Sequence, residues 1–576
     1  MTMKRYLPAI TALLLVFSLL TSCTYLSMIH DALSGYVHEL ADFRDLRYER
    51  PDITALDEDI DDLMARMADY EREDMLERLT DLVDRFYYDF QTMRNLAYLE
   101  YAKDMTDTYY RDEYYLLMTE GDRLMARLDE LYGYLAMSED ASYFEEKLFG
   151  EDFFQGYADE PNGYPEELVL LMQRESELLR DYGEAMTNIA VEYEGKIYTE
   201  ADLDAIEDEA LYRVVCEAYY QKYNKLLGDI YVELVGVRQA LSVAFGYRSF
   251  DEYAYTYYHA REYTPDEAKV YLEGIRTHLV PVYDMVMQAF DADRFAALPR
   301  LSPTDVVQKT QTVIKRIANA TSWTFDLADV YKEMVDNNLY TVGASPTMYY
   351  GSFQTYFPSV ETPYLFVNGS GYADDLLTMT HEFGHFASAY YNFGNTGSND
   401  EAEVASQALE LLSLRYLNNL LSDEEIALLR EYELYNLLSS LNECAAYTAF
   451  EDMVYADETP TLEECNAYFS RCMDDYGLSD YSESGVGGNR YWVFINHLIE
   501  YPYYMIGYSV SADVSIQIYE LGGVKSAETY MELMDRAYLY DFFGNLEAVG
   551  LSSPFEEGRA AAVAAFFTRE WEVLAA

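Results

Sequence analysis

The stretch "MTHEFGHFASAYYN", residues 379–392, decides both the fold and the chemistry expected of this chain. It places two of only seven histidines four residues apart, with a glutamate beside the first. Residues i and i+4 lie on one face of an α-helix, about 6 Å apart along its axis. His381 and His385 can therefore bind one metal ion while Glu382 lies next to it, an arrangement typical of the H-E-x-x-H motif of zinc peptidases.

The residues around this motif predict the helix itself. Asp374 and Asp375 suit the first turn, where acidic side chains interact favourably with the helix dipole. Asn392 and Gly394 can end the helix.

A catalytic zinc ion needs a third protein ligand and an open position. The next helical stretch, 401–410, offers Glu401, Glu403 and Glu410. Glu401 and Glu403 point to different faces, so both should not be ligands. Small residues after Glu403 would let this helix pack closely on the histidine helix. Glu410 can accept the proton of the second nitrogen of a ligand histidine, or it can simply be a solvent-exposed helix residue.

Length and composition bound the class of protein. The chain has 576 residues, enough for two or three domains or lobes. With 40 Lys and Arg against 103 Asp and Glu, its net charge is −63, which argues against nucleic acid or anionic lipid surfaces as partners. The cysteines after the N-terminal region lack zinc-finger spacing, and we expect them to be reduced and structural: Cys216, Cys444, Cys465 and Cys472.

Periodicity near 3.6 residues over long stretches predicts a mainly helical chain. Residues 24–195 read as amphipathic helices, and helices resume after a short break at 196–203. The stretch 337–372 differs, because it is rich in Tyr, Thr, Val, Phe, Gly and Pro and predicts short strands and turns. A strand edge beside the histidine helix could pair with an extended peptide backbone.

The N-terminus reads as a targeting segment. Lys4 and Arg5 precede an apolar run, residues 7–20, that is too short to span a bilayer comfortably and suits a signal peptide. The run ends in "LTSC", which resembles a bacterial lipobox, so residues 1–22 are expected to be removed and Cys23 to carry a lipid. The alternative is an ordinary secretory signal with an incidental cysteine.

The stretches around His381 and Glu403 resemble those of a known family. "HEFGH" followed by "AEVASQALE" is similar to the thimet oligopeptidase and oligoendopeptidase F family of zinc metallopeptidases, M3. The resemblance implies one zinc ion per chain with His381, His385 and Glu403 as its ligands. The interval between His385 and Glu403 is shorter than in the family.

A second match lies downstream, in "NRYWVFINHLIEYPYYMIGYSVSA", residues 489–512. It resembles the family's His-and-Tyr segment near the active site, and His497, Tyr504 and Tyr508 fall on the matching positions. Ile506 stands where the family has a tyrosine. The preceding "SGVGGN" resembles a flexible, glycine-bearing loop.

The resemblance implies a mainly α fold, with two helical lobes around a deep substrate cleft and a small β element beside the zinc helix. We expect an N-terminal helical lobe over 23–195 and a catalytic domain over 196–576. The implied activity is hydrolysis of internal bonds of short peptides, with Glu382 as general base and His497, Tyr504 or Tyr508 as oxyanion donors. The implied place is the outer side of a bacterial cell membrane, with the lipid at Cys23 as anchor.

Two alternatives stay open. A dipeptidyl carboxypeptidase would need a cationic clamp for the C-terminal carboxylate of its substrate, and Arg490 is the only arginine near the catalytic segment. A peptide-binding surface lipoprotein without catalysis would keep the fold, but the intact Glu382 argues against it.

Overall fold

The computed structural model describes residues 39–150, 153–155, 157, 165–186, 189–199, 202–203, 205–321, 327–394, 398–479, 488–536 and 541–575. Helices dominate these residues, which confirms the predicted mainly α fold. The predicted signal peptide and Cys23 lie outside the described residues.

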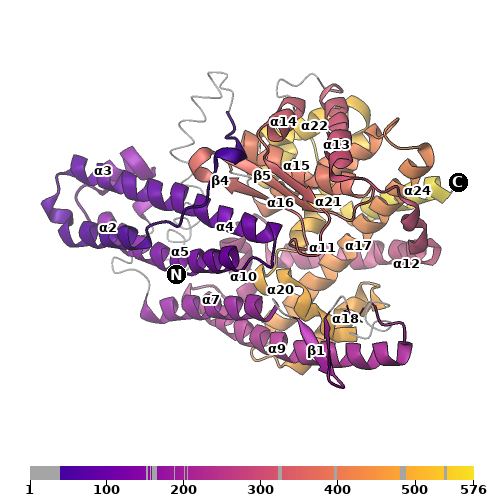
Figure 1. Cartoon of the computed structure of the whole chain (residues 1–576), viewed down its shortest axis with the longest axis horizontal. Helices are drawn as coiled ribbons and strands as arrows, with labels where there is room; N and C mark the ends of the chain where they lie inside the picture. The colour runs from indigo at the N-terminus through magenta and orange to yellow at the C-terminus, as the bar shows by residue number, and fades with distance from the viewer. Residues whose placement is uncertain are drawn as a thin grey trace. The chain divides into compact units, whose positions relative to one another are not determined.

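The chain divides into two compact units, each built from three stretches of sequence. Unit 1 comprises Met1–Pro165, Asp293–Arg430 and Ser515–Leu551. Unit 2 comprises Glu166–Ala292, Glu431–Val514 and Ser552–Ala576. Neither unit coincides with the predicted sequential division at residue 195. Figure 1 shows the interleaving within unit 1, where the indigo helix α4 lies beside the much later strand β4.

The first stretch of unit 1 is a group of helices around an aromatic and aliphatic core. Asp52 and Asp107 cap two of the helices, Asp52 accepting one backbone N–H of the first turn and Asp107 two. Leu79, Phe90 and Leu124 are fully buried between them. The helices are α2 (Ile53–Arg66), α3 (Arg72–Val83), the π-helix η3 (Asp84–Phe90), α4 (Gln91–Lys103), α5 (Thr108–Ala136) and α6 (Ala141–Phe144).

A three-stranded sheet and six further helices make up the rest of unit 1. The strand order is β3-β5-β4, with β3 parallel and β4 antiparallel to β5. Strand β5 is buried along nearly its whole length, as expected of an apolar central strand. The elements are α13 (Pro303–Ala318), α14 (Leu327–Asp336), β3 (Tyr340–Gly343), β4 (Phe353–Phe357), β5 (Thr362–Asn368), α15 (Asp375–Tyr391), α16 (Asn399–Ser413), α22 (Gly523–Arg536) and α23 (Phe542–Val549).

This sheet is the predicted β element, and α15, the helix of the H-E-x-x-H motif, packs on β5 and β4. Helix α16 packs along α15 in turn. The prediction of a small β element beside the histidine helix is therefore confirmed.

Unit 2 is helical apart from a short antiparallel hairpin, β1–β2, that the sequence did not predict. Its turn contains Glu194 and Gly195, both with positive φ. The elements are α7 (Glu166–Met186), β1 (Ala190–Tyr193), β2 (Lys196–Thr199), α9 (Glu209–Ala244), α10 (Phe250–Tyr253), the π-helix η6 (Ala254–Tyr258), α11 (Pro265–His278), α12 (Val280–Ala289), α18 (Leu462–Asp475), η10 (Gly488–Phe494), α20 (Asn496–Glu500) and α24 (Arg559–Ala575). Helices α17 (Asp423–Ala456) and α21 (Ile506–Leu521) contribute to both units.

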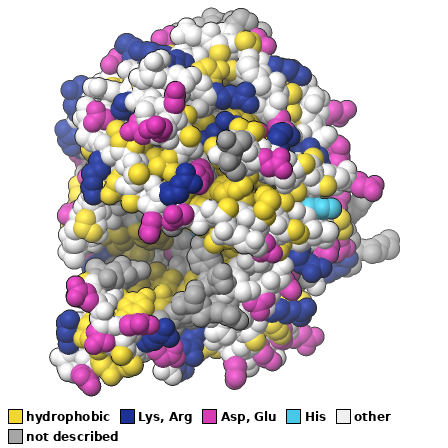
Figure 2. Space-filling view, turned by 90° about the vertical axis from the view of Figure 1, so that its right-hand side faces the viewer, with side chains coloured by type: hydrophobic (Ala, Val, Ile, Leu, Met, Phe, Trp, Pro, Cys, Tyr) yellow, Lys and Arg dark blue, Asp and Glu magenta, His cyan; other side chains and the backbone are white. Residues whose placement is uncertain are grey.

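The surface carries charges of both signs. On the face shown in Figure 2, acidic and basic side chains are interspersed among apolar ones. Among the described residues, no helix combines the length and the apolar character that crossing a bilayer requires. The four cysteines in the described part of the chain are buried and free, as predicted.

Candidate metal centre

Helix α15 presents both histidines of the motif on one face. It begins after Asp374 and ends before Asn392, as the flanking residues predict. Asp375 accepts the backbone N–H groups of Ser370 at 2.6 Å and Gly371 at 2.9 Å, and so fixes the turn that leads into the helix.

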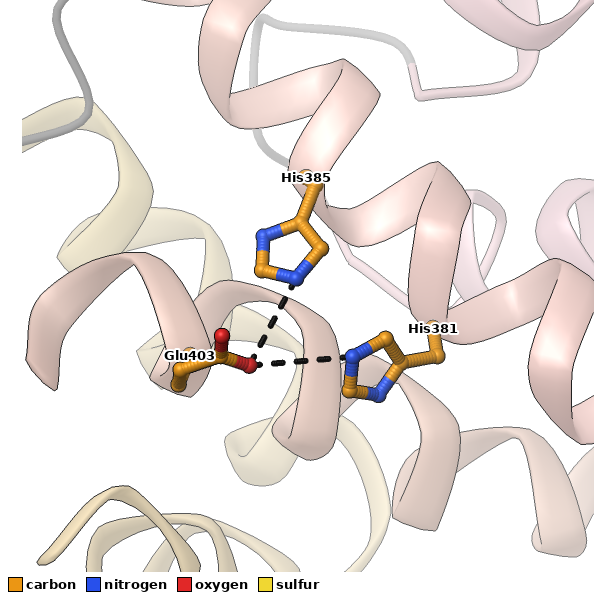
Figure 3. A group of neighbouring side chains, drawn as sticks. All are labelled: His381, His385 and Glu403. Atoms are coloured by element: carbon orange, nitrogen blue, oxygen red, sulfur yellow. Dashed lines mark ion pairs between the residues drawn. The ribbon is translucent and has the colours of Figure 1, made fainter. Parts of the chain in front are cut away.

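Three side chains converge between α15 and α16. His381 Nε2 lies 3.7 Å and His385 Nε2 3.5 Å from Glu403 Oε2 (Figure 3). Each residue offers one ligand atom, and the three atoms lie within 4.8 Å of one another. Ligands about 2.1 Å from a tetrahedral zinc ion lie about 3.4 Å from each other. The two measured distances match this separation, so the donor set fits zinc in both chemistry and spacing.

Close packing of the two helices makes this convergence possible. Gly384 lies between the two histidines, and a Cβ atom there would be 2.4 Å from the carbonyl oxygen of Ala405. Only glycine permits such an approach of one backbone to another. The same carbonyl accepts a hydrogen bond from the buried hydroxyl of Tyr530 at 2.9 Å, which ties α16 to α22.

The remaining glutamates of α16 separate into distinct roles. Glu410 Oε2 lies 2.9 Å from His381 Nδ1, the contact expected of a carboxylate that fixes the tautomer of a ligand histidine. With Nδ1 directed at Glu410, Nε2 is the nitrogen directed at Glu403. Glu401 instead accepts a hydrogen bond from Asn545 at 2.6 Å, so it does not join the group around the histidines.

Glu382 is a buried carboxylate beside His381, His385 and Glu403. It is 6% exposed, and its Oε2 has no hydrogen-bond partner among the described residues. Burial raises the pKa of Glu382. The two histidines lower this pKa and Glu403 raises it further, and the net direction is upward. A carboxylate with a raised pKa accepts a proton more readily, as a general base must.

The carboxylates around His385 raise the pKa of its ring. Burial lowers the pKa of His385, but the neighbouring carboxylates outweigh that effect, so the net direction is upward. The charge of Glu403 is the largest of the contributions that raise the pKa of His385. This cluster therefore attracts positive charge, as a site for a cation must.

The second predicted group lies in unit 2 and is compact in itself. The ring centroids of His497 and Tyr504 are 5.6 Å apart, those of His497 and Tyr508 6.1 Å, and those of Tyr504 and Tyr508 5.3 Å. The three side chains come from α20, the turn after it and α21. Of the stretch "SGVGGN", residues 484–487 lie outside the described residues.

The comparisons with known proteins agree with this architecture. Residues 43–159 match the family profile of the Peptidase M3 N-terminal domain. No curated protein sequence matches the chain at a significant level.

Solved structures resemble nearly the whole chain. A protein described as an oligoendopeptidase F superposes with a TM-score of 0.74 at 22% identity, over 92% of this chain and 99% of the other. PZ peptidase A, solved with an inhibitor, gives a TM-score of 0.74 at 19% identity, over 93% and 99%. A protein from Bacillus anthracis, also described as an oligoendopeptidase F, gives 0.70 at 20% identity, over 93% and 98%.

The class that emerges is a protein with the fold of oligoendopeptidase F and an N-terminal domain of the M3 peptidase type. The resemblance to the M3 family that the sequence motifs suggested is therefore confirmed.

Proposed function

We propose that this protein is a zinc-dependent endopeptidase that hydrolyses internal bonds of short peptides. The observation that carries the proposal is the group formed by His381, His385 and Glu403, whose donor atoms have the spacing of zinc ligands. The M3-type N-terminal domain and the oligoendopeptidase F fold support the same class of reaction.

Metal binding and proton transfer are assigned to different residues. His381, His385 and Glu403 would hold one zinc ion, which when bound lowers the pKa of water toward about 7 and polarises a carbonyl group. Glu382 takes the proton of the attacking water and passes it to the leaving amine. Its burial supports this role, because burial raises the pKa of Glu382 and so makes its carboxylate a stronger proton acceptor.

The oxyanion that develops on the substrate needs hydrogen-bond donors. His497, Tyr504 and Tyr508 carry donors and lie within one group of rings. Donors aimed at a developing charge act mainly in the transition state. We assign this role to the group, with Tyr508 as its first candidate. A deep cleft between two lobes, as the family resemblance implies, would favour short peptides over folded proteins.

The carboxypeptidase alternative finds less support. It needs a cation free to bind the C-terminal carboxylate of a peptide, and Arg490 is instead paired with Glu217 at 2.5 Å. The catalytically silent alternative finds less support as well, because Glu382 and the three-residue ligand set are both present.

We also propose that the protein acts outside the cytoplasm, held to the membrane by a lipid on Cys23. The proposal is motivated by the sequence "LTSC", in which small residues precede the cysteine at the end of an apolar run. Replacing Cys23 with Ser should abolish lipid labelling and release the protein from the membrane fraction. Unchanged labelling of that variant would contradict the anchor and leave the peptidase proposal untouched.

One experiment tests the activity directly. The protein is loaded with zinc, its metal content is measured, and hydrolysis of a quenched fluorescent peptide is followed, with products identified by mass spectrometry. Internal cuts that stop on chelation and return with zinc support the proposal. Release of C-terminal dipeptides alone would favour the carboxypeptidase, and stoichiometric zinc without any turnover would favour the silent binder.

A further inference from the structure

The backbone that carries His497, Tyr504 and Tyr508 is irregular at its centre. Helix α20 ends at Glu500 and α21 begins at Ile506, and the residues between them form a turn. Tyr503 in this turn has φ of 61°. That conformation costs a residue other than glycine about 1–2 kcal/mol and persists only where surrounding contacts impose it.

Three buried side chains from elsewhere in unit 2 bind this backbone. The N–H of Tyr503 donates to Glu451 Oε1 at 2.7 Å. His259 Nε2 lies 2.8 Å from the carbonyl oxygen of Pro502. The guanidinium of Arg238 donates to the carbonyl of Ile499 at 2.7 Å. We call Arg238, His259 and Glu451 the clamp; they come from α9, the end of η6 and α17 respectively.

The members of the clamp are themselves fixed. Arg238 is 1% exposed and also donates to Glu175 at 2.7 Å and to the hydroxyl of Tyr455 at 3.2 Å. Burial and the nearby Arg261 lower the pKa of His259 to about 3, so its ring is neutral and Nε2 carries the proton donated to Pro502. A neutral ring with one donor nitrogen can hold only one orientation at this carbonyl.

Glu451 is the acceptor of the clamp and is 0% exposed. Burial raises its pKa well above the ordinary value, although the N–H of Tyr503 opposes the shift. Burial therefore favours the neutral carboxyl, and its Oε1 accepts the N–H of Tyr503. This predicts that an amide can replace it.

The flanks of the segment are bound in the same manner. The hydroxyl of Tyr182 donates to the carbonyl of Val493 at 3.1 Å, and that of Tyr271 donates to the carbonyl of Ser509 at 2.8 Å. Side chains of several elements thus hold the backbone from 493 to 509 at intervals. An ordinary turn needs no such number of remote buried donors and acceptors, because short-range hydrogen bonds satisfy most turns.

We propose that Arg238, His259 and Glu451 are positioning residues for the catalytic segment, fixing the rings of His497, Tyr504 and Tyr508 in one mutual arrangement. The proposal rests on the function assigned above to those rings. The nearest link is His259, whose ring centroid lies 6.1 Å from that of Tyr504. Misplacing a reacting group by about 1 Å can cost up to about 100-fold in rate.

Paired variants separate the hydrogen bonds from bulk packing. Glu451→Gln keeps a neutral acceptor for Tyr503, whereas Glu451→Leu removes it. We expect near-normal kcat for the first and a decrease of about 10- to 100-fold for the second, with KM and zinc content little changed. His259→Phe keeps a ring but loses the donor and should resemble Glu451→Leu. His278→Phe, at an exposed histidine of the same unit, is the matched control and should leave kcat unchanged.

A double-mutant cycle distinguishes positioning from general destabilisation. If His259 acts through the ring group, His259→Phe should lower kcat much less in a Tyr504→Phe, Tyr508→Phe background than in the wild type, because two of the three rings have lost their donors. Equal losses in the two backgrounds would overturn the proposal, as would normal kcat for Glu451→Leu.

Hydrogen exchange provides a readout that does not depend on turnover. The backbone amides of residues 497–508 should exchange slowly in the wild type and at least about 10-fold faster in Glu451→Leu, while those of 375–391 stay unchanged. If the zinc-loaded wild type hydrolyses no peptide, the proposed function fails, and the exchange experiment still tests whether the clamp holds the segment. Unchanged exchange in Glu451→Leu would overturn the clamp alone.

Discussion

The two groups of polar side chains described above are positioned by different means. The group of His381, His385 and Glu403 stands on two regular helices, and its geometry follows from one close contact at Gly384. The group of His497, Tyr504 and Tyr508 stands on an irregular turn that remote buried side chains bind. The first depends on the packing of two regular helices, with Tyr530 and Asn545 hydrogen-bonded to α16, whereas in the second the irregular backbone itself is held by remote side chains. Metal binding and oxyanion stabilisation should therefore fail independently of each other.

The largest expected effects lie in the first group. His381→Ala removes a proposed ligand and should abolish both zinc binding and measurable turnover. Glu382→Gln should keep stoichiometric zinc, because Glu382 is not among the ligands, but should lower kcat by about 10²–10⁴-fold through loss of the general base. Metal analysis and turnover of a quenched peptide measure both. If Glu382→Gln loses its metal as readily as His381→Ala, the separation of roles is wrong.

The next effect lies in the second group. Tyr508→Phe removes one hydroxyl and should lower kcat by about 10²–10³-fold, because a donor to the oxyanion acts mainly in the transition state. KM, zinc content and the unfolding temperature should stay close to wild type. A loss confined to KM would return Tyr508 to a structural role and direct attention to Tyr504 or His497.

A smaller effect tests the close contact of α15 with α16. Gly384→Ala places a methyl group against the carbonyl of Ala405 and should lower the free energy of unfolding by about 1–3 kcal/mol and weaken zinc binding. Gly236→Ala is the matched control, because a Cβ atom at that position in α9 meets nothing within 4 Å. The control should gain about 0.5–1 kcal/mol. Denaturant unfolding and zinc titration measure these changes. Equal stability of the two variants would contradict the claim that the close contact at Gly384 requires glycine.

The smallest effect is a pH dependence of unit 2. Burial raises the pKa of Asp452 to about 7, and Asp251 adds to the shift while Lys269 opposes it. The folded state therefore keeps a proton that the unfolded chain releases near pH 4. Its contribution to stability is complete below about pH 4 and is lost as the pH rises through about 7.

This contribution should amount to about 1–2 kcal/mol once solvent screening is included. Urea unfolding between pH 4 and pH 8 measures it, with Asp452→Asn as the variant that flattens the profile. An Asp452→Asn protein with the same pH slope as the wild type would assign the dependence to other groups.

The sequence predicted those parts of the molecule that depend on short-range signals. The motif, its flanking Asp374 and Asn392, and the 3.6-residue periodicity were enough to place α15. The spacing to Glu403 and the small residues after it indicated the second helix. The composition of 337–372 indicated strands, although not the parallel pairing of β3 with β5, which joins residues that are not adjacent in the chain.

The clamp could not be predicted in this way. Arg238 and Ile499 are 261 positions apart, and His259 and Pro502 are 243 apart. A histidine in an apolar helical stretch suggests burial, but nothing near it in the sequence identifies the carbonyl that it meets. Tyr503, Glu451 and Tyr530 are likewise ordinary residues until the fold brings their partners to them.

The contacts of Tyr530 and Asn545 with α16 also set the order in which unit 1 can be completed during translation. Tyr530 is separated from Ala405 by 125 residues, so at about 5–20 residues per second the ribosome needs roughly 6–25 s to supply it. During that interval the helix that carries Glu403 lacks its hydrogen bonds from the Tyr530 hydroxyl and the Asn545 amide. A nascent chain that stops before Ser515 should therefore expose the apolar side of α16 to chaperones and bind zinc poorly, although every ligand has already been synthesised.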